Sequence, residues 1–254
     1  SDGTHSAEYD YLANSPLVEQ IQFKENTATR MTTTKSYDLL NRLTRMASAP
    51  SGSALVSFDY TYNDAGQRQR VTLSDGSYWV YAYDSLGQVT SGKKFWPDGT
   101  PVAGQQFEYG FDDIGNRQQT KAGGDANGAN LRQASYTPNL LNQYDSRTVP
   151  GAEAVTGIAL AGSGVQVNGH PPTTQGDYFH RELPVANTAG PVWQSVTVSA
   201  TGQPATSGHV FVAQTPELFV HDADGNLTQD GRWSYTWDTE NRLVAMESLG
   251  TVPE

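Results

Sequence analysis

Cysteine is missing from this sequence: none of its 254 residues is a cysteine. A disulfide framework, a thiolate zinc site and a thiol nucleophile are therefore excluded. Histidine is also scarce, because only five residues are scattered along the chain, which leaves little material for a metal cluster. We therefore expect no cofactor.

Long apolar runs and positive charge are missing as well. No stretch approaches about 18 consecutive apolar residues, so we expect no membrane span. The 16 Lys and Arg stand against 27 Asp and Glu, which gives a net charge of −11. Such a chain lacks the basic face that duplex nucleic acid requires, so we expect no nucleic-acid partner. The first residues also lack the basic and apolar segments of a signal peptide.

What the chain does have is a recurring motif. An aromatic residue is followed by Asp or Asn, two variable residues, Gly or Asn, and a polar residue. The copies begin at Tyr37, Tyr62, Tyr83, Phe111, His221 and Trp237, with a weakened copy at Pro138. The copies at Tyr37, Tyr62, Tyr83, Phe111 and Pro138 start about 25 residues apart, which suits two strands and two turns. Helical repeats usually take about 33–47 residues.

The motif has the chemistry of a β-turn between two strands. An aromatic residue lies two positions upstream in six of the seven copies, and residues i and i+2 share one face of a strand. The acidic position can accept backbone N–H groups two residues on, and glycine supplies the positive φ that closes the turn. These turn residues are Asp38, Asp84, Asp112, Asp222 and Asp238, with Gly66, Gly87, Gly115 and Gly225.

This motif resembles the YD repeat of RHS (rearrangement hot spot) proteins over residues 9–145 and 215–254. The resemblance implies an antiparallel sheet of β-hairpins that curves or spirals into a hollow shell. In RHS and toxin-complex proteins such shells enclose a C-terminal toxin or effector, and they are secreted or displayed at bacterial surfaces. The partners implied are the rest of the same RHS shell and an encapsulated effector. Teneurins use a related shell for adhesion.

Residues 147–214 lack the motif and form an insert in the repeat. Their composition shifts to Val, Thr, Ser, Ala and Gly, with alternation in Val165–Val167 and Val196–Ala200. Several short strands at 8–12-residue spacing predict a small β-sandwich that resembles bacterial Ig-like modules. An ornate hairpin within the shell is the alternative. The predicted domains are therefore a YD-repeat sheet at 1–146, the insert, and a YD-repeat hairpin at 215–254.

Few residues suggest chemistry beyond structure. Trp193 and Tyr178 are candidate ligand contacts, because aromatic rings stack on sugars, although core packing explains most aromatic residues equally well. His180 is a candidate contact or a packed strand histidine. Asp222, Asp224 and Asn226 resemble part of a calcium loop, but the residue at its twelfth position is Trp233, not Glu. Nucleophile elbows, zinc-protease motifs and phosphate loops are absent.

Together these patterns predict an all-β, non-enzymatic segment of an RHS-type shell with an inserted β-sandwich. The alternative function is a carbohydrate-binding or cell-surface adhesion module that recognises surface glycans. Burial of one aromatic residue of each pair is expected to contribute about 1.5–3 kcal/mol. We also expect unpaired strand edges to drive self-association.

Overall fold

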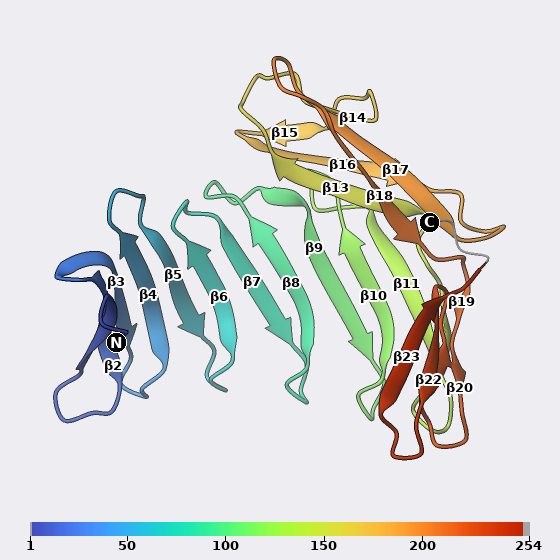
Figure 1. Ribbon diagram of the computed structural model, residues 1–254, viewed down its shortest axis with the longest axis horizontal. Coiled ribbons are helices and arrows are strands. Elements are labelled where there is room, and N and C mark those ends of the chain that lie inside the picture. The colour runs from blue at the N-terminus through green and yellow to red at the C-terminus, as the bar shows by residue number, and fades with distance from the viewer. Residues whose placement is uncertain (1, 251–254) are drawn as a thin grey trace. The chain divides into compact units, whose positions relative to one another are not determined.

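A computed structural model describes residues 2–250 of the chain. These residues form 23 β-strands and contain no helix, which confirms the all-β prediction (Figure 1). The chain divides into two compact units, Ser1–Pro101 and Val102–Glu254. Each unit is described by itself below.

Unit 1 is an antiparallel meander in which each strand pairs with the next strand along the chain. This is the sheet of consecutive hairpins that the repeat predicts. Its strands are β1 (His5–Tyr11), β2 (Val18–Glu25), β3 (Ala28–Tyr37), β4 (Leu43–Pro50), β5 (Val56–Tyr62), β6 (Arg68–Leu73), β7 (Tyr78–Tyr83) and β8 (Val89–Phe95).

Unit 2 contains the same kind of meander, followed by a second small sheet. Its first strands are β9 (Pro101–Phe111), β10 (Arg117–Gly123), β11 (Leu131–Pro138) and β12 (Tyr144–Arg147), and β12 pairs with β19 (Glu217–Leu218). The last strands pair in order as β20 (Val220–His221), β21 (Leu227–Gln229), β22 (Trp233–Trp237) and β23 (Leu243–Ser248).

Between β12 and β19 the insert folds into two three-stranded sheets. One contains β13 (Ala152–Ile158), β16 (Tyr178–Pro184) and β15 (Thr173–Gln175), and the other β14 (Gln166–Val167), β17 (Val192–Ser199) and β18 (Thr206–Val212). The sheets share a core of Val165, Val167, Phe179 and Leu183. The domain boundaries and the likeness to Ig-like modules stay predictions.

The repeat continues in space across the insert. Ser146 and Arg147 of β12 lie in register with Leu218 and Glu217 of β19. The amide nitrogen of Gln143, in the last turn before the insert, donates to the carbonyl oxygen of Gly225 at 3.4 Å, in the first motif turn after it. The two ends of the insert therefore lie close together, at the paired strands β12 and β19.

The motif turns have the backbone that their residue types predict. Gly66, Gly87, Gly115 and Gly225 have φ values of 77° to 92°, and Asn replaces Gly at 41, 142 and 241 with φ values of 58° to 61°. In three repeats of unit 1 the register shifts immediately before the lead tyrosine, which marks a β-bulge there.

The repeat aromatics are only partly buried. Every lead residue of the six full copies retains some exposure, and the buried apolar side chains of unit 1 are the smaller Ala47 and Val71. The described strands of unit 1 form a single layer, so no second layer within that unit covers the rings. Tyr83 is only partly buried, so Tyr83→Ala should cost less than the about 3–5 kcal/mol that truncation of a fully buried aromatic residue costs.

Candidate functional site

Six of the seven motif turns are closed by the same set of hydrogen bonds. In the first copy the N–H of Asp38 donates to the carbonyl oxygen of Arg42 (3.0 Å), and Asp38 Oδ1 accepts the N–H groups of Leu40 (2.9 Å) and Arg42 (3.0 Å). This bonding recurs at Asp84, Asp112, Asn139, Asp222 and Asp238. The side-chain Oδ1 of the Asp or Asn is therefore the acceptor that fixes each of these turns.

These hydrogen bonds stabilise the ionised form of four turn aspartates, Asp38, Asp112, Asp222 and Asp238. The backbone N–H of Arg42 lowers the pKa of Asp38, and the backbone N–H of Arg242 lowers that of Asp238. At Asp112 the side-chain amide of Asn116 is the leading cause of the lowered pKa. The turns at Asp38, Asp112 and Asp238 are consequently formed by carboxylates at neutral pH.

The candidate calcium loop is one of these turns. Asp222 Oδ1 accepts the N–H groups of Asp224 (3.0 Å) and Asn226 (2.8 Å), and Oδ2 accepts the Asn226 amide (3.1 Å). Within residues 2–250 no group of three or more His, Cys, Asp or Glu residues has an arrangement suited to a metal ion. Both carboxylate oxygens of Asp222 thus already accept hydrogen bonds within the turn.

The lead ring of a repeat reaches back to the strand that follows the preceding turn. The Tyr37 hydroxyl donates to the carbonyl oxygen of Val18 (2.9 Å), and the Tyr62 hydroxyl to that of Leu43 (2.6 Å). The Tyr83 hydroxyl donates to Arg68 (2.7 Å), and Trp237 Nε1 to Leu227 (2.8 Å). We call this bond the lead-ring clamp.

The clamp was not predicted from the sequence. Its sequence signal is the preference for Tyr or Trp at the lead position, since Phe111 has no polar atom to donate. The arginine of the motif adds a second link between neighbouring repeats. The Arg42 guanidinium lies 4.7 Å from the centre of the Tyr62 ring, within the range of a cation–π contact.

Removing one clamp hydroxyl should destabilise the sheet measurably. We expect Tyr62→Phe to lower the free energy of unfolding by about 1 kcal/mol, because the ring stays and only one hydrogen bond is lost. Tyr11→Phe is the control, since Tyr11 is 55% exposed. Urea unfolding of both variants measures the difference, and equal stability of the two would contradict the clamp.

Trp193 lies in an aromatic cluster rather than by itself. Its ring stacks on His209 with centres 5.7 Å apart, and it pairs across the strands with Phe211. The Arg232 guanidinium lies 5.3 Å from the Trp193 ring and 4.9 Å from each of the Phe211 and Trp233 rings. The Trp193 ring, a candidate ligand contact, therefore connects the insert to Arg232, the residue immediately before β22.

One face of β16 joins the insert to the sheet of unit 2. Tyr178, His180 and Glu182 alternate along the strand and so share this face. The Tyr178 hydroxyl donates to the carbonyl oxygen of Ala103 (2.7 Å), and a Glu182 carboxylate oxygen lies 3.1 Å from Arg132 Nε. Tyr178, the second candidate ligand contact, is thus anchored to β9.

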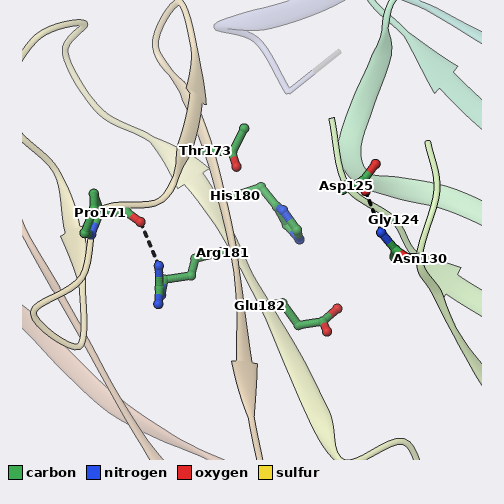
Figure 2. A pocket seen from close by; sticks show the side chains of 8 residues that line it. All are labelled: Gly124, Asp125, Asn130, Pro171, Thr173, His180, Arg181 and Glu182. Atoms are coloured by element: carbon green, nitrogen blue, oxygen red, sulfur yellow. Dashed lines mark hydrogen bonds between the residues drawn. The ribbon is translucent and has the colours of Figure 1, made fainter. Parts of the chain in front are cut away.

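Beside this contact the structure has a cavity of about 290 Å³ (Figure 2). The turn after β10 contributes Asp125 and Asn130 to its lining, and the insert contributes Thr173, His180, Arg181 and Glu182. Asp125 accepts hydrogen bonds from the N–H groups of Asn127 and Ala129 and from the Asn130 amide, and Arg181 donates to Pro171. Asp125, Asn130 and Arg181 of the lining therefore already form hydrogen bonds with other residues of the chain.

Sequence reasoning found neither the cavity nor the turn at Asp125. That turn has the bonding of a motif turn, but Gly124 replaces the lead aromatic, so the motif does not match it. The short run Asp125–Gly128 was the available signal. His180, in contrast, is a packed strand histidine, 6% exposed.

Comparison with solved structures supports this fold. The chain superposes on a chain of "Crystal Structure of TcdB2-TccC3-Cdc42" with a TM-score of 0.50 and 13% identity, covering 96% of this chain and 12% of that one. A chain of "Crystal Structure of TcdB2-TccC3-TEV" gives a TM-score of 0.47 and 15% identity over the same shares. The chain thus spans only about an eighth of the solved chains that it resembles.

The sequence comparisons are narrower. No curated protein matches the chain. The family model described as RHS Repeat matches residues 62–93, which run from the lead Tyr62 through β6 and β7 into β8. This match begins at the lead Tyr62 and includes the next motif copy, so residues 62–93 contain an RHS repeat. The fold of the chain is similar to that of the toxin-complex chain.

Proposed function

We propose that this chain is a non-catalytic, structural segment of an RHS-type β-shell that encloses or displays a C-terminal toxin or effector. The observation that carries the proposal is the meander of hairpins whose aromatic rings are only partly buried and of whose seven motif turns six are closed by the same hydrogen bonds. Such a sheet suits a wall, because every hairpin repeats the same contact with the one before it. The toxin-complex fold supports the same role.

The proposed partners are the remaining repeats of the same shell and the effector that the shell holds. A secreted or surface-displayed location follows from this role. No helix among residues 2–250 is both long and apolar enough to cross a membrane.

Strand edges are the surfaces through which such a wall would continue. Among the described strands, β1 pairs only with β2, and β23 pairs only with β22. Neither edge strand contains Lys or Pro, the residues that commonly protect edges. Val244 and Met246 of β23 are 60% and 50% exposed.

We therefore expect the isolated chain to self-associate by strand pairing as its concentration rises. Light scattering coupled to size exclusion measures the mass. The double variant Val244→Lys/Met246→Lys should shift the population toward the monomer, because charge on an edge strand opposes pairing.

A matched control distinguishes strand pairing at the edge from nonspecific association of exposed apolar side chains. Leu140 is 102% exposed but lies in a turn, not on an edge strand, so Leu140→Lys should leave the association unchanged. A strict monomer at high concentration, or an equal effect of Leu140→Lys, would contradict an edge-paired wall.

The second candidate function is glycan recognition or adhesion by the insert. It rests on the partial exposure of the Trp193 ring at the surface of the insert. Saturable binding on a glycan array that disappears in Trp193→Ala would support it. The contacts of Trp193 with His209 and Arg232 and the bond of Tyr178 to Ala103 favour the structural role.

A further inference from the structure

A histidine is buried where the insert contacts the sheet of unit 2. His180 lies on the inner face of β16 and is 6% exposed. Its ring presses on Gly104 of β9: a Cβ atom at Gly104 would lie 2.5 Å from His180 Cδ2 and 3.0 Å from Nε2. Only glycine therefore leaves room for this ring at the junction, and the φ of 79° at Gly104 also favours glycine.

The buried ring has one nitrogen without a partner. His180 Nε2 is inaccessible to water and makes no hydrogen bond. A neutral imidazole tolerates this arrangement, since one of its two nitrogens carries no proton, but an imidazolium carries an N–H on both. A second proton would therefore place a buried donor against the backbone of β9 with nothing to accept it.

The charged groups around His180 do not offer a ready acceptor. From β11, Arg132 brings a positive charge, and its Nε is 3.1 Å from Glu182 on β16. Asp125, in the turn after β10, already accepts three hydrogen bonds. Arg181 points away from His180, as Figure 2 shows, and donates to Pro171.

The remaining strands add one more titratable group. Thr156 of β13 and Thr173 of β15 are the cross-strand neighbours of His180, and neither titrates. Glu153 of β13 also interacts with Arg132; burial raises its pKa, and the arginine opposes that rise. Protonation of Glu153 would leave Arg132 less neutralised and so would act in the same direction as a proton on His180.

We propose that His180 is an acid-sensitive lock: the neutral ring holds β16 of the insert against β9, and protonation loosens this contact. The lock is independent of the shell function proposed above. Other contacts also join the insert to this sheet: the hydrogen bonds of Tyr178 to Ala103 and of Arg132 to Ala152, and the ion pair of Arg132 with Glu182. Burial raises the pKa of the Tyr178 phenol, so this group stays neutral between pH 5.5 and 7.5, and we assign the response in this range to His180.

The direction of the pH effect follows from the burial. Burial lowers the pKa of His180, and the Arg132 charge lowers it further. The released state binds its proton near the ordinary pKa of about 6.5, so it binds more protons than the docked state below that pH. The contact is therefore at full strength above pH 6.5, and each unit of acidification below it increases opening up to about tenfold.

Hydrogen exchange of the full chain, followed by mass spectrometry at pH 7.5 and 5.5 and corrected for intrinsic rates, tests the lock. Amides in β9 and β16 should lose up to about tenfold of their protection at pH 5.5. Amides in β2 and β3 of unit 1 should keep theirs. Unchanged protection of β9 and β16 would overturn the proposal.

Two variants and a titration complete the test. His180→Gln should remove the pH dependence, whereas His170→Gln, at an exposed histidine of the same insert, should retain it. If His180→Gln keeps the full pH response, His180 is not the sensor. The His180 resonance of the unaltered chain should titrate below 6.5 by NMR, and titration at or above that value would overturn the lock even if His180→Gln fails to fold.

Discussion

Glu217→Ala is expected to lower the free energy of unfolding by about 3 kcal/mol, the low end for breaking a buried ion pair. The Glu217 side chain is 6% exposed and pairs with Arg147, whose side chain is 37% exposed. Burial works against the charge on Arg147, but Glu217 opposite it raises the pKa of the guanidinium above its ordinary value. Truncation would leave this cation without its partner.

Glu217 also accepts the N–H of Gly231 at 3.3 Å, and a Cβ on Gly231 would lie 2.7 Å from the same carboxylate oxygen. Urea unfolding should place Glu247→Ala, an exposed control, within about 0.5 kcal/mol of the unaltered chain. The pair Arg147→Met/Glu217→Leu should recover part of the loss, because it leaves no buried charge. A single Glu217→Ala change as mild as the control would show that the ion pair does not stabilise the return from the insert.

Phe179→Ala should be at least as damaging, with a loss of about 3–4 kcal/mol. Phe179 is 4% exposed in the core shared by the two sheets of the insert. A Cβ on Gly157, directly opposite on β13, would lie 2.5 Å from the phenyl ring, so the ring fills the space to the backbone. Truncation would leave a cavity that this rigid surface cannot close.

The neighbouring Ile158 provides the control for Phe179. It is 82% exposed on the adjacent residue of β13, so Ile158→Ala should change stability by no more than about 0.5 kcal/mol. Thermal unfolding followed by circular dichroism compares the two variants. Similar melting temperatures for both would show that the insert lacks the sandwich core described here.

Local chemistry made the hairpins predictable. An Asp that accepts N–H groups two and four residues on, followed by Gly or Asn with positive φ, specifies its turn within five residues. Val167 and Val196 could likewise be assigned to strands, because alternation of apolar and polar residues marks their segments. The partial exposure of the aromatic rings in the single-layer sheet was not predicted. The repeat shows that the rings share one face of a strand, but it does not indicate whether a second layer covers that face.

Contacts between distant segments were beyond such reasoning. His180 and Gly104 are 76 positions apart, and the fit of a ring against a glycine leaves no periodic trace in the sequence. The cluster around Arg232 joins Trp193 and Phe211 from the insert to Trp233 beyond it. The prediction that Trp193 contacts a ligand considered only its own ring, because the neighbouring cation, Arg232, lies 39 positions further along the chain.

The junction at Arg147 and Glu217 has a consequence for how such proteins diversify. These two residues face each other across β12 and β19, although 69 residues separate them along the chain. A folded unit whose two ends lie close together can be carried there without altering the hairpins on either side. The position is therefore suited to exchange of modules by recombination, and to grafting of a foreign domain by design.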